Sequence, residues 1–202
     1  MERAKSRREE YSEATRQALI DSATTLFADG GYSGTSLDDI AASARVTKGA
    51  LYHHFAGKQA LLEAVIDQLE QGIVDTTASA MEAVPDAWQA TIVALDAFLD
   101  RCCDPAYSRI VMQEGPVALG FQRWRECEEK YAYGLVEAIL RSLIDGGHIE
   151  PLPLQVTSRL AFGMLGAAAL AIAEADDASK HDVMDESRTV VLRFLYGLRP
   201  AP

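Results

Sequence analysis

Residues 36–58, SLDDIAASARVTKGALYHHFAGK, constrain the fold most strongly because they contain two helix starts with little chain between them. Ser36 is followed three residues later by Asp39, which is the spacing of a capping box with aspartate in place of glutamate. Thr47 has the side chain to cap a second helix, over about 48–54. Only a tight turn fits between these helices, so the stretch predicts a helix-turn-helix.

The rest of the chain is also predicted to be helical, because its apolar residues recur at spacings of three and four. No segment has the alternation of a strand, so we expect an all-α protein of about nine helices. Gly115-Pro116 and Gly120 predict a break that can act as a hinge. The other expected helices are 12–29, with Ser12 as N-cap, 58–80, 86–103, 107–114, 121–145, 154–175 and 182–196.

Charge is distributed unevenly along the chain. Residues 1–60 contain eight Lys/Arg and eight Asp/Glu, so the net charge of −11 lies entirely in the later residues. Phosphate repels an acidic body, and contacts with nucleic acid must therefore come from the first part. The residues Arg3, Lys5, Arg7 and Arg8 predict a basic arm that touches DNA, or a solvated tail.

Composition indicates a soluble globular protein, with 49% hydrophobic and 24% charged residues. Because no run of about 18 apolar residues occurs and no apolar segment follows the charged N-terminus, we expect a cytoplasmic protein without a membrane span or secretory signal. The three cysteines match neither a disulfide framework nor a zinc site. No catalytic set or phosphate-binding glycine loop is evident, so we expect no enzyme, no metal and no cofactor.

In a helix-turn-helix, the second helix enters the major groove of DNA and its N-terminal residues approach the base edges. Gly49 and Ala50 are small enough for close approach, and Lys48 can reach a phosphate or a guanine. The other candidates carry polar groups for phosphate oxygens, and they are Thr35, Ser36, Thr47, Tyr52, His53, His54 and Lys58. Some have a purely structural alternative, since Ser36 and Thr47 can serve only as caps and Tyr52 can belong to the core.

Residues 17–66 resemble the N-terminal domain of the tetracycline-repressor (TetR) family of transcriptional regulators. The matching segments are LFADGGYSGTSLDDIA, VTKGALYHHF and GKQALL, in the order and spacing of the family. The resemblance implies that the candidates above lie where the family contacts operator DNA, and that the positions of Tyr52 and Lys58 hold phosphates. A later run, RIVMQEGPVALGFQRWRECEE, resembles one subgroup of the family's ligand-binding domains, which implies a fold but no particular ligand.

We therefore expect two domains. Residues 1–57 would form the N-terminal arm and the helix-turn-helix DNA-binding domain. Residues 58–202 would form a helical ligand-binding and dimerisation domain, in which 58–80 is the linking helix.

A palindromic DNA site requires two copies of the chain, with recognition helices roughly 34–36 Å apart. Residues 160–173, LAFGMLGAAALAIA, are apolar and rich in small residues, which allow close helix packing. With the last helix they predict an intermolecular four-helix bundle, although an intramolecular core pair has the same pattern. The expected interface residues are Gly163, Gly166, Ala167, Leu170, Val191, Phe194 and Leu195.

The middle helices carry bulky or soft apolar side chains with a few polar ones, which is typical of a ligand pocket and also of a plain core. The pocket candidates are Phe98, Cys102, Met112, Gln113, Phe121, Trp124 and Tyr131. A largely apolar small-molecule effector in this pocket would favour a dimer whose recognition helices do not fit the operator.

The predicted function is a ligand-responsive repressor that binds palindromic, double-stranded operator DNA as a homodimer. One alternative is a thiol-based redox sensor that uses Cys102 or Cys103. The other is a ligand-independent or activating DNA-binding protein.

Overall fold

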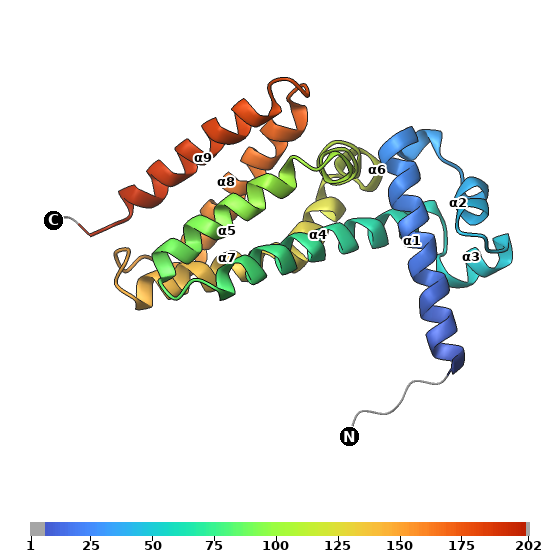
Figure 1. Ribbon diagram of the computed structural model, residues 1–202, viewed down its shortest axis with the longest axis horizontal. Helices are drawn as coiled ribbons and strands as arrows, with labels where there is room; N and C mark the ends of the chain where they lie inside the picture. Colours follow the sequence, from blue (N-terminus) through green and yellow to red (C-terminus); the bar gives the residue numbers. More distant parts are fainter. Residues whose placement is uncertain (1–6, 201–202) are drawn as a thin grey trace.

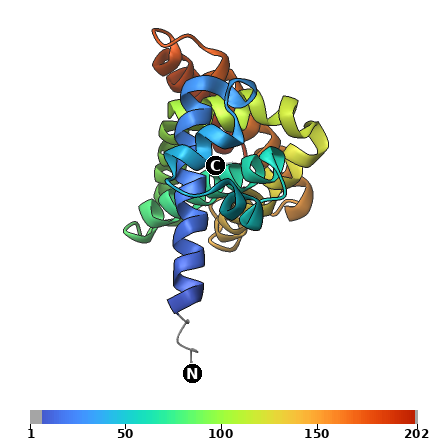
Figure 2. The ribbon, with the colours of Figure 1, turned by 90° about the vertical axis from the view of Figure 1, so that its right-hand side faces the viewer.

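The computed structural model of the protein describes residues 7–200. In this range it has nine α-helices, one π-helical segment (η1) and no β-strand, which confirms the prediction of an all-α fold. Figure 1 shows α1, α2 and α3 gathered at one end as a head, from which α4 extends along a larger helical body. Seen from the head end in Figure 2, α1 projects beyond the body.

The elements follow one another with short connections. Their bounds are α1 Arg7–Gly34, α2 Leu37–Ser43, α3 Lys48–His54, α4 Lys58–Glu82, α5 Ala87–Cys102, η1 Tyr107–Glu114, α6 Gly115–Leu119, α7 Phe121–Asp145, α8 Leu154–Glu174 and α9 Lys180–Gly197.

Local capping sets the start of α2 and of α3. The Ser36 hydroxyl accepts a hydrogen bond from the Asp39 amide at 3.1 Å, and the Asp39 carboxylate accepts one from the Ser36 amide at 3.1 Å. The Thr47 hydroxyl accepts from the Ala50 amide at 3.2 Å. Between the helices, Arg45 adopts a left-handed conformation with φ 56°, which turns the chain sharply. These features confirm the predicted helix-turn-helix.

The first helix differs from its prediction at the N-terminal end. It begins at Arg7, so Ser12 lies inside α1 and is not its N-cap. The expected end at the paired glycines is seen as a kink at Gly31, where φ is 76° and ψ is 160°. Of the expected basic arm, Arg3 and Lys5 lie outside the described residues, and the two arginines at 7 and 8 belong to the first turn of α1.

The predicted break at Gly115-Pro116 is wrong, because η1 runs directly into α6. Gly115 has helical angles, and Pro116 occupies the first turn of α6, where a missing N–H is tolerated. The chain bends instead at Gly120, whose φ of 80° suits glycine.

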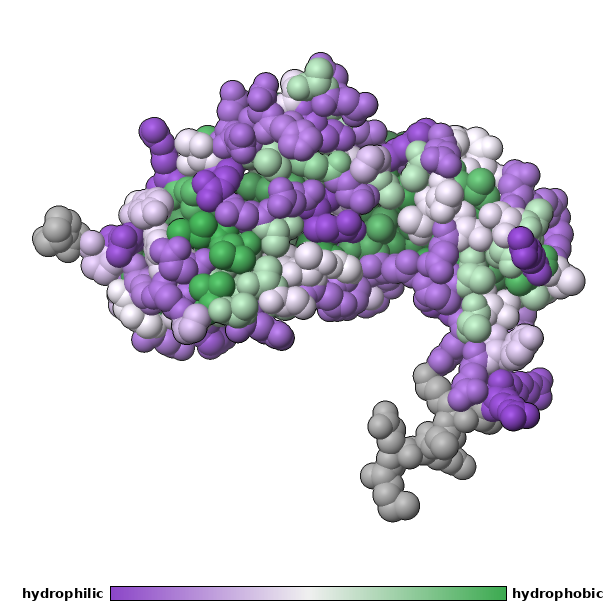
Figure 3. Space-filling view, viewed as in Figure 1, coloured by the Kyte–Doolittle hydropathy of each residue, from purple (hydrophilic) through white to green (hydrophobic). Residues whose placement is uncertain are grey.

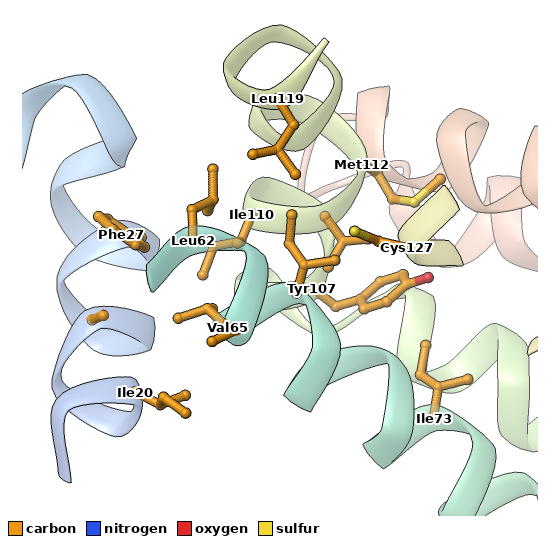
Figure 4. Close-up of a cluster of buried hydrophobic side chains, with 14 of the residues drawn as sticks. Ile20, Phe27, Leu62, Val65, Ile73, Tyr107, Ile110, Met112, Leu119 and Cys127 are labelled. Atoms are coloured by element: carbon orange, nitrogen blue, oxygen red, sulfur yellow. The ribbon is translucent and has the colours of Figure 1, made fainter. Parts of the chain in front are cut away.

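One cluster of buried apolar side chains extends from the head into the body. Figure 4 shows Ile20 and Phe27 of α1 next to Leu62 and Val65 of α4, with η1 on the far side. The start of α4 is therefore packed on both head and body. The domain boundary at residue 57 remains a prediction.

Candidate nucleic-acid interface and ligand cavity

The exposed side of α3 and its cap carry most of the predicted DNA-binding residues. Leu51 is fully buried and fixes the opposite side of this helix in the core. Tyr52 is 50% exposed, so its ring is not a core residue. The exposed candidates are Ser36, Thr47, Lys48, Gly49, Tyr52 and His53, and the partly exposed ones are Ala50, His54 and Lys58.

Two lysines of this face have weak partners within the protein. The Lys48 ammonium lies 2.7 Å from an Asp38 carboxylate oxygen, and both side chains are more than half exposed. The Lys58 ammonium lies 4.3 Å from the centre of the Tyr32 ring. Exposed ion pairs and cation–π contacts contribute little, so a phosphate can replace or join these partners.

Sequence reasoning missed Arg16, a further cation beside this face. Its guanidinium lies 5.2 Å from the ring centre of Phe55, directly after α3. Burial lowers the pKa of His54, and the charges of His53 and Arg16 lower it further, so His54 is neutral at physiological pH. Neutral imidazole can still donate one hydrogen bond to a phosphate.

Thr35 is placed differently from the other candidates. Its side chain is only 6% exposed, and its hydroxyl lies 3.0 Å from the Leu26 carbonyl and 2.9 Å from the Gly31 carbonyl. The hydroxyl therefore satisfies the end of α1 and does not face outward with the polar groups of α3. A cap-like sequence context gave no sign of this inward orientation.

The body contains a cavity of about 640 Å³ between α4, α5, α7, α8 and α9. This volume suits a drug-sized ligand. Its walls are apolar apart from a few side chains. The polar lining residues are Glu70, Thr77, Thr91, Tyr107, Glu128 and Thr157.

Of the predicted pocket residues, Phe98 lines this cavity. Cys102 is buried at 1% exposure in the core beside it. Tyr131 does not line the cavity, and its ring lies 4.7 Å from the Lys130 ammonium. The other four, Met112, Gln113, Phe121 and Trp124, surround a separate depression next to α8. Helical spacing predicted apolar faces correctly but not which of them border empty space.

Two buried carboxyl groups in the cavity were also missed. Glu70 is 2% exposed and Glu128 is 9% exposed. The Tyr107 hydroxyl donates a hydrogen bond of 3.0 Å to Glu70. Burial raises the pKa of Glu70 to about 7 and that of Glu128 to about 8, and the charge of Glu70 adds to the second shift. The sequence did contain a signal for the first of these acids, because Glu70 interrupts the apolar stripe of α4 four residues after Ile66.

The segment η1 joins this cavity to the head. While Tyr107 lines the cavity, the Arg109 guanidinium donates to the carbonyls of Ala28 and Asp29 at 2.7 and 3.0 Å. The Glu114 carboxylate accepts from the Tyr32 amide at 2.5 Å. Arg109 and Glu114 also pair at 3.2 Å. We call these two side chains and their bonds to α1 the η1 clamp.

Gly31 makes room for the η1 clamp. A Cβ atom at this position would lie 2.8 Å from the Arg109 guanidinium and 2.8 Å from the Glu114 carboxylate. The positive φ of Gly31 also disfavours any other residue. π-Helical turns such as η1 occur frequently at functional sites.

The side of α8 and α9 that faces away from the core is apolar. Leu160 is 71% exposed and Phe194 is 62% exposed. Apolar residues are also visible in a hollow between α9 and the layer of α4 and α5 (Figure 3). Among residues 7–200, α8 is long and apolar enough to cross a membrane by length and composition only, and 28% of its apolar 18-residue window is buried. Such a face requires a cover.

The predicted interface residues divide between this face and the interior. Gly163, Ala167, Leu170 and Phe194 are exposed. Gly166 and Leu195 are partly exposed and line the cavity together with Phe194. Val191, at 7% exposure, belongs to the core of the single chain and is not part of the surface.

The cysteines have little thiolate character. Cys102 and Cys127 are buried, and Cys103 is partly buried. Burial raises the pKa of all three thiols, which favours the unreactive protonated form. This environment disfavours the redox-sensor alternative.

Two family models match the chain. One, described as "Bacterial regulatory proteins, tetR family", matches residues 19–65. The other, described as "Tetracyclin repressor-like, C-terminal domain", matches residues 88–198, which is more than half of the chain.

Individual proteins are similar over most of their length. The transposon Tn10 TetC protein of Escherichia coli is 31% identical over 159 residues, which are 79% of this chain and 80% of that protein. A TetR-family regulator from Pectobacterium atrosepticum has a solved structure with a TM-score of 0.83 and 28% identity, covering 98% of this chain and 100% of that one. The regulator FadR of Bacillus subtilis, solved with stearoyl-CoA, shares the fold with a TM-score of 0.73 and 19% identity over 89% of this chain and 97% of that one.

The buried carboxyl groups predict an unusual pH dependence of stability. A raised folded-state pKa means that folding retains a proton which the unfolded chain releases above about pH 4.3. Stability is therefore greatest at low pH and falls as pH rises towards about 7 for Glu70 and about 8 for Glu128. Replacing either residue by glutamine removes this loss.

We expect Glu70→Gln and Glu128→Gln each to be more stable than the unmodified protein by roughly 3–5 kcal/mol near pH 8.5, and by only about 1 kcal/mol near pH 5. Urea denaturation at both pH values and one protein concentration measures the difference. Glu137→Gln, at a more exposed position farther along α7, is the control and should change stability little at either pH. Equal stability of all four proteins at high pH would contradict the burial of charge.

Proposed function

We propose that two copies of this chain, which belongs to the TetR family of ligand-responsive, DNA-binding transcriptional regulators, bind a palindromic operator. They would release the operator when a largely apolar molecule fills the cavity. The observation that carries the proposal is the position of η1. This segment lines the cavity with Tyr107 and holds the DNA-binding head with Arg109 and Glu114.

On the DNA side, α3 would lie in the major groove with Lys48, Gly49 and Ala50 nearest the bases. Tyr52 and Lys58 would hold phosphates, and Arg16 would add a further positive charge along the backbone. Ser36, Thr47, His53 and His54 supply polar groups at the same face. Thr35 would act on DNA only indirectly, by fixing the end of α1.

The dimer would form by packing α8 and α9 against the same helices of a second copy. The exposed apolar side chains of Leu160 and Phe194 support this arrangement. The small residues Gly163 and Ala167, on the same side of α8 as Leu160, would allow close helix approach. A partner covering this face would also bury the exposed apolar side chains of α8. Isologous packing of this kind gives the two-fold symmetry that a palindrome requires.

The effector would occupy the large cavity, because its volume and apolar walls fit a drug-sized molecule. Bacillus subtilis FadR, which shares this fold, was solved with stearoyl-CoA, a molecule with a long apolar chain. A molecule in contact with Tyr107 would change the preferred position of η1. The η1 clamp would pass this displacement to the end of α1 and so to the spacing of the two recognition helices.

Such a switch requires that the effector bind the two states with different affinity. A coupling free energy of roughly 1–3 kcal/mol, or about 5- to 150-fold in operator affinity, is typical. Operator DNA must then weaken effector binding by the same factor.

Replacing Lys58 by methionine removes the charge while keeping the apolar stem. We expect operator affinity to fall roughly tenfold, and the slope of log affinity against log salt to fall by about one, because one phosphate contact is lost. An operator selected from random duplexes by the unmodified protein would be titrated by fluorescence anisotropy at several salt concentrations. Lys180→Met, on α9, should behave as the unmodified protein, and an unchanged salt slope for Lys58→Met argues against the phosphate contact.

Replacing Phe194 by glutamate places a charge in the proposed dimer face. We expect a folded monomer in sedimentation velocity, because burying an unpaired carboxylate opposes association. The control is Val117→Glu on α6, which is also exposed but lies outside α8 and α9. Dimers that persist in the Phe194 variant would place the interface elsewhere.

Replacing Arg109 by methionine breaks the η1 clamp. Loss of its bonds to the α1 carbonyls, roughly 1.5–3 kcal/mol for charged donors, should speed amide exchange at residues 28–34 about tenfold or more and weaken operator binding. Hydrogen-exchange mass spectrometry and anisotropy measure the two effects. Arg141→Met, which breaks a surface pair with Glu137, should change neither. Unaltered exchange in the Arg109 variant would show that the clamp does not hold the head.

A further inference from the structure

We propose that the cavity selects an organic cation, namely a largely apolar molecule whose positively charged nitrogen is held between the carboxylates of Glu70 and Glu128. The inference rests on the proposed function only in taking this cavity as the effector site. It adds the charge and chemical class of the ligand.

The two carboxyl groups meet at the cavity from different elements. Glu70 on α4 and Glu128 on α7 both line it, with side chains almost entirely removed from solvent. Glu70 accepts one hydrogen bond, from Tyr107, a neutral partner. Within residues 7–200 the Glu128 carboxylate has no hydrogen bond and no ion pair. Buried carboxyl groups are ordinarily paired with a cation or fully hydrogen-bonded, so this pair lacks a positive partner.

Two arginines near this part of α7 are already paired at the protein surface. Arg125 lowers the pKa of Glu128, but its guanidinium is 3.1 Å from a carboxylate oxygen of Glu129. Arg159 of α8 lies 3.6 Å from the same Glu129 carboxylate. Neither residue lines the cavity.

The surroundings of Glu70 are no more positive. Asp67 on the same helix raises the pKa of Glu70, and Lys130 is bound to Asp67 at 2.9 Å. At the end of α5, Cys102 is a protonated thiol and Arg101 is paired with Asp104 at 3.3 Å. On α9, Arg188 pairs with Asp96 at 2.5 Å. The described chain thus places two acids in the cavity and directs its cations elsewhere.

A third polar group supports a ligand rather than a filled core. Thr77 is 4% exposed, lines the cavity two turns along α4 from Glu70, and its hydroxyl has no hydrogen-bond partner among the described residues. A buried hydroxyl without a partner is costly, and a ligand polar group would satisfy it. Aromatic rings of Phe98, Tyr107 and Phe162 also line the cavity and can face a cation.

Electrostatics then discriminates between ligand classes. Without a ligand, each carboxyl group avoids the cost of a buried charge by holding a proton near neutral pH. A cation replaces these protons and is bound by up to two carboxylates in a medium of low dielectric constant. A carboxylate or phosphate ligand meets repulsion from the same groups. A neutral ligand leaves them protonated and gains no ion pair.

The test compares three ligands of equal chain length with the full-length protein, namely decylammonium, 1-decanol and decanoate, by isothermal titration calorimetry. Near pH 8.5, where both carboxyl groups are largely ionised, we expect decylammonium to bind at least about tenfold more tightly than 1-decanol and decanoate to bind most weakly. Lowering the pH to about 6 should weaken decylammonium binding about tenfold or more and leave 1-decanol unchanged. At about pH 6, where both carboxyl groups still hold protons, titrations in buffers of different ionisation enthalpy should detect released protons.

Variants assign the effect to the two acids. In Glu70→Gln/Glu128→Gln the preference for decylammonium over 1-decanol should fall to within about threefold, and proton release should disappear. Glu137→Gln, which alters a carboxyl group farther along α7 that does not line the cavity and pairs with Arg141, should retain both. Urea denaturation of each variant confirms that it is folded.

The inference is overturned if 1-decanol or decanoate binds as tightly as decylammonium, or more tightly, near pH 8.5. It is also overturned if the preference for decylammonium survives in the double variant, or if none of the three ligands binds. Operator titrations separate these results from the proposed function. Release of operator by 1-decanol or decanoate, without a preference for the cation, would keep the function and refute the cation. Cation binding that leaves operator affinity unchanged would support the cation and refute the effector role of the cavity.

Discussion

The hydrogen bonds of the η1 clamp are the interaction on which the rest of the molecule depends. Arg109 and Glu114 reach from the body to the last turn of α1, where carbonyl and amide groups lack helical partners. Charged donors and acceptors make these bonds stronger than neutral ones. They join the body to the head beside the apolar contacts that α1 makes with α4. Gly31 is required because any side chain there would displace both clamp residues.

This arrangement explains why two acids can persist in an apolar cavity. Glu70 and Glu128 lower stability at neutral and high pH, and a core built for stability alone would replace them with apolar residues. Tyr107, which bonds to Glu70, lies on the segment that also carries the clamp, so the acidic part of the cavity is connected with the part that contacts the head. Strongly shifted carboxyl groups in a cleft are typical of functional sites.

The sequence predicted what depends on local chemistry. The caps at Ser36 and Thr47 are interactions within four residues, so the bounds of α3 agree with the prediction. The cavity is set by contacts between α4, α7 and α8 that are far apart in the chain, and helical spacing shows only that each has an apolar side. For this reason Cys102 and Met112 were expected at a pocket and lie outside the large cavity.

Helical spacing is equally unable to show which residues of the predicted dimer face are exposed. Val191 and Phe194 are three residues apart on α9 and both line the cavity, yet Val191 is buried and Phe194 is exposed, a difference that helical spacing does not reveal. Gly166, Phe194 and Leu195 border the cavity and also belong to the predicted dimer face. In a dimer packed through α8 and α9, one wall of the cavity would therefore be supported by the partner. An effector that fills the cavity would then contact η1 on one side and the dimer face on the other. The position of the head and the packing of the dimer, which together would set the distance between the recognition helices, would both respond to one ligand.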